Sequence, residues 1–315
     1  MPPLITVKNL TKNFPYKKTQ LRALSEINLT INQGETLGLV GESGSGKSTL
    51  GKLLLRLQEP TSGEVFFGDK NIFSFPSHLL KSWRQNAQMI FQDPYSSLNP
   101  RMRAEKIISE PFYIHNIPIP ENQLDELFLQ VGLDPSFRSR FPHEFSSGQR
   151  QRLSIGRAIA LKPHFIVCDE PLSALDVSIQ AQIATLLKDL QQNLGLTYLF
   201  ITHDLRMAKV ISHRIAVLYL GHIVELAHSS ELYKTPYHPY TEALLSAIPT
   251  FEKKKTRIIL KGEPPSPLNP PKGCPFASRC PKAQSLCNKT PPPLRELSKG
   301  HYAACHFPNG DPPCP

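Results

Sequence analysis

The stretch that decides the fold is Thr36-Leu37-Gly38-Leu39-Val40, followed directly by Gly41-Glu42-Ser43-Gly44-Ser45-Gly46-Lys47-Ser48. The first five residues form an apolar run typical of a buried strand, and the next eight fit the phosphate-binding pattern G-x-x-x-x-G-K-[ST]. The glycines allow successive backbone N–H groups to converge on an anion, and the helix predicted from Lys47 to Leu57 directs its N-terminus at the same point. The pattern predicts a nucleoside triphosphate site formed by Gly41, Ser43, Gly44, Ser45, Gly46, Lys47, Ser48 and Thr49.

A second apolar run, residues 165–168, ends in the two carboxylates Asp169 and Glu170. Without a phosphate-binding loop, an ordinary strand end with solvated acids would explain this pair. Beside such a loop, we expect Asp169 to hold Mg²⁺ together with the Ser48 hydroxyl, and Lys47 to contact the β- and γ-phosphates. Glu170 is then placed to polarise the water that attacks the γ-phosphate.

Predicted strands and helices alternate along much of the chain, which indicates an α/β fold with a largely parallel sheet flanked by helices. We expect strands at residues 4–8, 21–31, 36–40, 64–68, 87–91, 164–168, 196–201 and 213–218. We expect helices at residues 47–57, 104–115, 121–131, 150–161, 178–194 and 204–211. The residues from about 93 to 160 therefore form a mostly helical insert.

The composition divides the chain in two. It has 315 residues with a net charge of +10, and from Ser229 onward it carries 12 Lys and Arg against 6 Asp and Glu, with 17 of the 31 prolines. This shift predicts an α/β domain over residues 1–228 and a loop-rich region over 229–315. No segment approaches the ~20 apolar residues of a membrane-spanning helix and the start lacks a signal-peptide core, so we expect a soluble, intracellular chain.

The segment Phe145-Ser146-Ser147-Gly148-Gln149 resembles the signature sequence of the ATP-binding cassette (ABC) superfamily, Leu-Ser-Gly-Gly-Gln. Ser146, Gly148 and Gln149 match that signature, whereas Phe145 and Ser147 depart from it. The Ser147 side chain lies where it could crowd a phosphate, which leaves its effect on turnover open.

Further superfamily elements follow in the expected order. They are the aromatic residue that stacks on adenine, the Q-loop glutamine, the D-loop aspartate and the switch histidine, matched here by Phe14, Gln92, Asp176 and His203. The resemblance covers roughly residues 4–228. It implies a RecA-like parallel sheet, an antiparallel β subdomain and a helical signature subdomain.

The same resemblance implies a composite active site. Two cassettes face each other head to tail, so that Ser146, Ser147, Gly148 and Gln149 contact the ATP bound by a partner cassette, which is identical or related. Glu170, His203 and Gln92 are the implied catalytic residues, and Ser48, Gln92 and Asp169 the implied Mg²⁺ ligands.

Residues 92–102, 231–241 and 244–249 resemble one branch of the superfamily, the ATPase subunits of dipeptide and oligopeptide importers. The resemblance implies a peripheral protein on the cytoplasmic face of the cell's inner membrane, docked on two integral-membrane permease subunits and served indirectly by a substrate-binding protein. The substrate stays open among peptides, nickel, glutathione and antimicrobial peptides.

Two other functions compete with this one. A soluble cassette ATPase could use the basic charge on nucleic acid, but such proteins normally carry two cassettes or a long coiled coil, so we expect no nucleic-acid partner. A redox sensor with a vestigial ATPase is disfavoured by the intact Lys47, Glu170 and His203.

The loop-rich region contains four cysteines separated by five, six and seventeen residues: Cys274, Cys280, Cys287 and Cys305. Disulfides are not expected in a cytosolic chain, and structural zinc prefers pairs about two to four residues apart. Some members of the branch hold a [4Fe–4S] cluster on such cysteines, so we expect a cluster, with zinc and free thiols as alternatives. Residues 264–271 are expected to be a stiff polyproline spacer.

Overall fold

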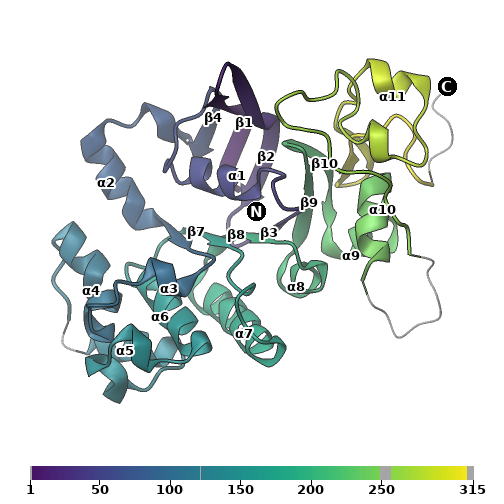
Figure 1. Ribbon diagram of the computed structural model, residues 1–315. Coiled ribbons are helices and arrows are strands. Elements are labelled where there is room, and N and C mark those ends of the chain that lie inside the picture. The colour runs from purple at the N-terminus through teal and green to yellow at the C-terminus, as the bar shows by residue number, and fades with distance from the viewer. Residues whose placement is uncertain (1, 121, 249–256, 311–315) are drawn as a thin grey trace.

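An eight-stranded sheet runs through the centre of the protein (Figure 1), in the order β11-β12-β10-β9-β3-β8-β7-β6. The computed structural model describes residues 2–120, 122–248 and 257–310. Five strands form the predicted parallel part: β6 (Ala87–Ile90), β7 (Phe165–Asp169), β8 (Thr197–Thr202), β3 (Thr36–Val40) and β9 (Arg214–Tyr219). Three antiparallel strands extend it: β10 (His222–His228), β11 (Arg295–Ser298) and β12 (His301–Ala303). Every residue of β3, β7 and β8 is buried, as expected of parallel strands covered on both faces.

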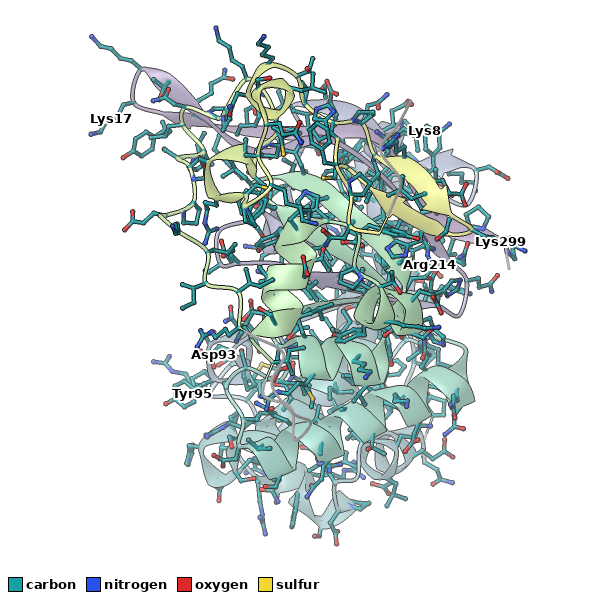
Figure 2. The ribbon with its side chains drawn as sticks, turned by 90° about the vertical axis from the view of Figure 1, so that its right-hand side faces the viewer. Lys8, Lys17, Asp93, Tyr95, Arg214 and Lys299 are labelled. Carbon is teal, nitrogen blue, oxygen red and sulfur yellow. The ribbon has the colours of Figure 1, made fainter. Side chains whose placement is uncertain are left out.

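A separate antiparallel sheet lies above the parallel one in Figure 1 and has the order β2-β1-β4-β5. Its strands are β1 (Pro3–Tyr16), β2 (Thr19–Asn32), β4 (Ser62–Phe67) and β5 (Lys70–Asn71). The β1–β2 hairpin is longer than the sequence predicts, because backbone pairing continues to Tyr16 and Thr19 without a buried face. Lys17, with φ 50°, projects from its tip (Figure 2).

The helices are α1 (Lys47–Leu54), α2 (Ser77–Asn86), α3 (Pro94–Ser97), α4 (Ala104–His115), α5 (Gln123–Gln130), α6 (Ser147–Ile159), α7 (Val177–Leu194), α8 (Leu205–Ile211), α9 (Ser229–Lys234), α10 (Pro239–Ser246) and α11 (Ser285–Lys289). The six helices predicted up to residue 211 are confirmed. No helix is predicted from the sequence at α2, in which Trp83 is the only buried residue. Helices α3 to α6 form a lobe beside the sheet (Figure 1).

The C-terminal region joins the central sheet through β12, which pairs with β10. At this junction the fully buried carboxylate of Glu225 accepts hydrogen bonds from the backbone N–H groups of Tyr237 (2.6 Å) and His238 (3.0 Å). His301 Nε2 lies 2.7 Å from the same carboxylate. Since a buried charge requires such partners, Glu225 fixes the C-terminal strands and the segment before α10 to one edge of the sheet.

Candidate active site

The loop between β3 and α1 is held in a conformation that only glycine adopts easily. Gly46 has φ 107°, and a Cβ atom there would lie 2.5 Å from the carbonyl oxygen of Ala23 in β2. A Cβ atom on Gly41 would lie 2.1 Å from the carbonyl oxygen of Leu218 in β9. The loop therefore packs directly against the backbones of both sheets, and its shape depends on these two glycines.

Lys47, the first residue of α1, is buried, and no carboxylate of the described residues forms a hydrogen bond or ion pair with it. Its ammonium group donates to the carbonyl oxygens of Gly41 (2.9 Å) and Glu42 (2.9 Å) instead. Burial lowers the pKa of Lys47, and the negative charges of Glu170, Asp169 and Glu42 partly oppose that shift. A cation held only by neutral oxygens is suited to binding an anion such as a phosphate.

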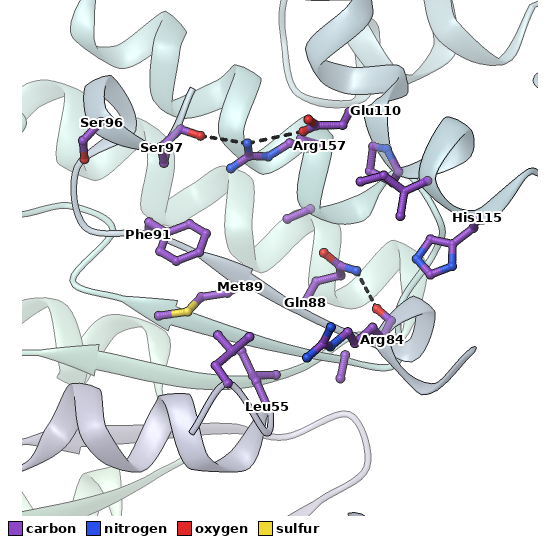
Figure 3. A pocket seen from close by; sticks show the side chains of 15 residues that line it. Leu55, Arg84, Gln88, Met89, Phe91, Ser96, Ser97, Glu110, His115 and Arg157 are labelled. Carbon is purple, nitrogen blue, oxygen red and sulfur yellow. Dashed lines mark hydrogen bonds and ion pairs between the residues drawn. The ribbon is translucent and has the colours of Figure 1, made fainter. Parts of the chain in front are cut away.

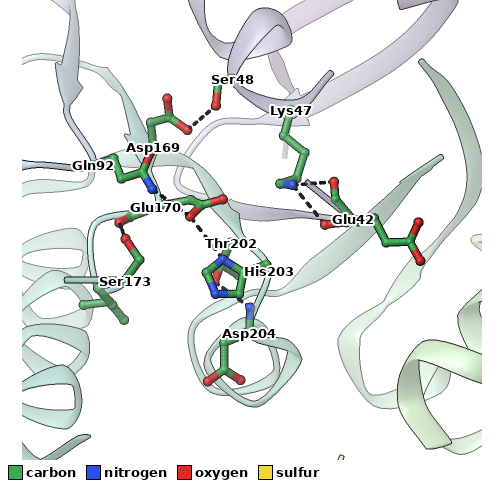
Figure 4. Close-up of polar contacts among 12 residues, drawn as sticks. Glu42, Lys47, Ser48, Gln92, Asp169, Glu170, Ser173, Thr202, His203 and Asp204 are labelled. Atoms are coloured by element: carbon green, nitrogen blue, oxygen red, sulfur yellow. Dashed lines mark hydrogen bonds and ion pairs between the residues drawn. The ribbon is translucent and has the colours of Figure 1, made fainter. Parts of the chain in front are cut away.

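Ser48 and Asp169 meet across the site as the sequence predicts. The Ser48 hydroxyl donates to Asp169 Oδ1 at 2.8 Å (Figure 4). Burial raises the pKa of Asp169, and the nearby Glu170 adds to this, while the hydrogen bond from Ser48 opposes it. Mg²⁺ prefers oxygen ligands, so the hydroxyl at the start of α1 and the carboxylate at the end of the buried strand β7 fit that ion.

Glu170 links two loops through one oxygen of its carboxylate. Gln92 Nε2 donates to Glu170 Oε2 at 3.2 Å, and His203 Nδ1 lies 3.1 Å from the same atom (Figure 4). Glu170 has φ 45°, an uncommon conformation for a non-glycine residue, and its side chain is only 16% exposed. Gln92 therefore contacts Glu170. Among the described residues, it forms no hydrogen bond with Ser48 or Asp169, the other two predicted Mg²⁺ ligands.

Except for Asp169, these side chains line a pocket of about 730 Å³, a volume in the range of small-molecule sites. Its lining residues are Phe14, Leu21, Arg22, Ala23, Ser43, Gly44, Gly46, Lys47, Ser48, Thr49, Gln92, Glu170, His203 and Pro267. Phe14 is half-buried on β1, with the Lys12 ammonium 4.9 Å from its ring centre. Pro267 was not predicted here: a proline in a presumed spacer carries no sequence signal for a ligand pocket.

The signature segment forms the start of a helix and does not line this pocket. Ser146 caps α6: its hydroxyl accepts from the Gln149 N–H (3.3 Å), and Gln149 Oε1 accepts from the Ser146 N–H (3.0 Å). Gly148 is buried, and a Cβ atom there would lie 2.7 Å from Ile179 in α7. Neither Ser147 nor the exposed Asp176, which precedes α7, lines the pocket.

A second cavity, which we call the groove, lies between the helical lobe and the sheet (Figure 3). Its apolar lining includes Leu55, Met89, Phe91 and Ile114. Arg157 closes one side by donating to the carbonyl oxygen of Ser97 (2.8 Å) and pairing with Glu110 (3.8 Å). Phe91 lines this groove and the next residue, Gln92, lines the pocket, so the two sites are connected by adjacent residues.

The four cysteines of the C-terminal region come together around α11. Burial raises the pKa of Cys274 to about 11 and that of Cys305 to about 12, and the neighbouring cysteines add to both shifts. Backbone N–H groups that follow Cys274, Cys280 and Cys305 in the chain hydrogen-bond to their sulfur atoms. Even so, the described residues contain no group of three or more His, Cys, Asp or Glu arranged to hold a metal ion.

Pocket, loop and sheet together define a P-loop nucleotide hydrolase. Comparison with protein families matches residues 24–173 to the ABC transporter family and residues 224–287 to the oligopeptide/dipeptide transporter C-terminal region. The putative oligopeptide transport ATP-binding protein YkfD of Bacillus subtilis (strain 168) is 52% identical over 314 residues, covering 97% of this chain and 95% of the relative. AppF of the same strain, an oligopeptide transport ATP-binding protein, is 48% identical, covering 96% and 97%.

Solved structures agree with this assignment. The dimeric MJ0796, described as a bacterial ABC transporter cassette, superimposes with a TM-score of 0.65 at 30% identity, covering 71% of this chain and 98% of the other. The chain belongs to the ABC transporter family and has its cassette fold. It is an ATPase of the kind whose ATP hydrolysis drives transport through membrane permeases. No helix among the described residues is both long and apolar enough to cross a membrane.

Proposed function

We propose that this chain binds and hydrolyses ATP to power the import of peptides of the dipeptide and oligopeptide class. The observation that carries the proposal is that Lys47, Ser48 and Glu170 line one pocket, with Asp169 hydrogen-bonded to Ser48 behind it. The match of residues 224–287 to the peptide-transporter C-terminal region supports the substrate class. Uptake of nickel, glutathione or antimicrobial peptides is the alternative for the same ATPase, and nucleic acid is not a partner.

In the proposed reaction the glycine-rich residues 41–46 and Thr49 surround the phosphates and Phe14 stacks on the base. The Lys47 ammonium exchanges its two carbonyl partners for phosphate oxygens. Ser48, Asp169 and Gln92 would hold Mg²⁺, which would neutralise part of the phosphate charge. Glu170 accepts the proton of the attacking water, while His203 and Gln92 orient its carboxylate.

We infer that the active unit is a pair of cassettes. Ser146, Ser147, Gly148 and Gln149 do not line this chain's own pocket, although they begin a capped helix whose N-terminus suits an anion. A partner cassette, identical or related, would bring its pocket to them, with Asp176 at the same interface. MJ0796, a relative in fold, forms a dimer.

We infer that the groove beside α4 receives a permease segment. ABC importer ATPases act on such membrane partners, and the groove presents exposed apolar side chains, Phe91 at 38% and Ile114 at 55%. The chain position of Gln92, next to Phe91, connects movement in the groove to the Glu170 carboxylate. Docked in this way on two permease subunits, the chain lies on the cytoplasmic face of the inner membrane and meets the substrate-binding protein only indirectly.

We further infer that residues 229–315 form a C-terminal domain attached to a cassette of residues 1–228, with the helical insert at about 93–160. Four clustered thiols with N–H donors to three of the sulfurs are the donor set of an iron–sulfur cluster, with zinc as the alternative. The fit is partial, because the thiols are not arranged as metal ligands. Binding of a cluster therefore requires Cys274, Cys280, Cys287 and Cys305 to draw closer together.

The first prediction concerns the base. In the transporter reconstituted with its permeases, Glu170→Gln should lower ATP hydrolysis and peptide uptake by about 10²–10⁴-fold, the usual effect of removing a general base, with ATP affinity retained. Glu126→Gln, at an exposed position of α5, is the matched control and should leave both rates unchanged. Wild-type turnover in the Glu170 variant would remove it from this role.

The second prediction tests the pair. Hydrolysis per chain should rise with the concentration of the isolated chain, and Gly148→Asp should lower it by about 10²-fold, as expected when an aligned anion contact is lost. Gly156→Ala, on the same helix α6, is the control for disturbed helix packing, since its Cβ atom would lie 3.0 Å from Ile108 of α4. A full, concentration-independent rate from a monomer would disprove the composite site.

The third prediction tests the groove. Ile114→Asp should abolish co-purification with the permease subunits, because a charge cannot be buried there without a partner, and should leave ATP binding intact. Leu129→Asp changes an equally apolar, 64% exposed side chain of α5 that does not line the groove, and it should not affect assembly. Normal assembly of the Ile114 variant would exclude this docking site.

The fourth prediction concerns the cysteines. Chain purified without oxygen should contain about four irons and four sulfides, the content of one [4Fe–4S] cluster. Loading should increase as the pH rises, because the raised pKa values of Cys274 and Cys305 keep those thiols protonated at neutral pH. Cys305→Ser should lower the iron content and Cys314→Ser should not; Cys314 lies outside the described residues. One zinc per colourless chain would identify the alternative metal.

A further inference from the structure

The C-terminal region contacts the phosphate-binding loop through the side chains of Arg279 and Tyr240. Arg279 lies at the end of the short 3₁₀ helix Ala277–Arg279, and its guanidinium donates to both carboxylate oxygens of Glu42. The distances from Nη1 are 3.1 and 2.8 Å, and that from Nη2 is 3.1 Å. Only 8% of the Arg279 side chain is exposed. This bidentate pairing with a largely buried guanidinium fixes the orientation of the Glu42 carboxylate as well as its position.

Glu42 is the second residue of the loop, and its backbone is also held on both sides. Its N–H donates to the Tyr240 hydroxyl at 3.0 Å. Its carbonyl oxygen accepts from Lys47 Nζ at 2.9 Å and from the Ser45 N–H at 3.2 Å. Through its side chain and its backbone, Glu42 therefore connects Arg279 with the Lys47 ammonium group, which is expected to bind phosphate.

Arg279 rests on a group of aromatic rings that shields its guanidinium from water, while 30% of the Glu42 side chain is exposed. Tyr219, Tyr240 and Phe276 have ring centres 4.6 to 5.4 Å apart, and the guanidinium carbon lies 5.9 Å from the Tyr219 ring. The Tyr219 hydroxyl also accepts from Arg279 Nη1 at 3.4 Å. In such a shielded site an ion pair is stronger than on the surface, so displacement of Glu42 is opposed.

The C-terminal region reaches the same pocket at a second place. Pro267 lines the pocket, and its carbonyl oxygen accepts a hydrogen bond from the Arg22 N–H at 3.1 Å, on the strand that carries Leu21 and Ala23. The two contacts, Pro267 and Arg279, lie on either side of the cysteine Cys274 in the sequence. Residues 257–310 thus contribute to the pocket independently of the sheet pairing at β12.

We propose that Arg279 is a positioning residue of the ATP site: by holding Glu42 it keeps the loop backbone and the Lys47 ammonium in the geometry that binds phosphate. The inference rests on the proposed nucleotide site. It makes the C-terminal region part of that site, so that loss of the arginine weakens ATP binding even where the fold survives.

A second buried Arg–Glu pair provides a matched control. Arg214 donates to both oxygens of Glu35 at 3.2 Å, with side-chain exposures of 15% and 5%. Both residues lie at the N-terminal ends of strands β9 and β3, whereas the loop follows the C-terminal end of β3. Figure 2 shows Arg214 on the side of the molecule opposite Asp93, which follows Gln92. Removing this pair tests the cost of losing a buried ion pair away from the pocket.

The experiment measures equilibrium binding of a fluorescent ATP analogue to the full chain, together with thermal unfolding. Arg279→Met and Glu42→Gln should each weaken binding about tenfold, as expected for a charge-assisted hydrogen bond, and the double variant should be no weaker than either single one. Arg279→Lys keeps the positive charge but cannot form the bidentate hydrogen bonds, so it should retain part of the affinity that Arg279→Met loses. Arg214→Met should lower the melting temperature and leave the affinity unchanged.

Lys47→Ala separates failure of this inference from failure of the proposed site. If Lys47→Ala abolishes binding while folded Arg279→Met and Glu42→Gln variants bind normally, Arg279 only attaches the C-terminal region and the proposal is wrong. Additive losses in the double variant would also overturn it. If Arg279→Met does not fold, the Arg279→Lys and Glu42→Gln variants decide by the same criteria. Unchanged binding by Lys47→Ala would refute the nucleotide site itself.

Discussion

A buried ammonium group held by backbone carbonyl oxygens is the constraint on which the rest of the site depends. Lys47 sits at the start of α1 and donates to two backbone carbonyls, so its charge is solvated by the loop itself. Burial favours the neutral amine, while Asp169 and Glu170, close enough to act electrostatically, favour the cation. A polyanion that enters the pocket can therefore contact the Lys47 ammonium, the loop N–H groups and the N-terminus of α1.

The loop that carries Lys47 holds its shape because three parts of the chain close around it. The β1–β2 hairpin contributes the Ala23 carbonyl next to Gly46, the central sheet contributes the Leu218 carbonyl next to Gly41, and the C-terminal region contributes Arg279 next to Glu42. Each contact is too close to allow a different loop conformation without movement of a backbone or loss of an ion pair. The nucleotide site therefore forms where the hairpin, the central sheet and the C-terminal region meet, which explains how a region remote in sequence becomes part of it.

The polar residues around Glu170 show how the site is connected to its surroundings. Gln92 and His203 both contact one carboxylate oxygen, yet they follow different strands and lead to different surfaces. The Gln92 loop continues from the groove beside α4, and His203 leads into α8. A carboxylate with two exposed partners can respond to changes on either side, which suits an ATPase whose hydrolysis drives movement in other subunits.

The sequence by itself determined the class of site, because its signals are local. Asp169, Gln92 and His203 follow separate strands, and the carboxyl ends of parallel strands meet at one edge of the sheet, so their proximity to Lys47 was predictable. Only the tertiary structure decided the contributions of Pro267 and Arg279, the pairing of β12 with β10, and the course of α2. These depend on contacts between residues far apart in the chain: Arg279 meets Glu42 across 237 positions, and no local pattern records that pairing.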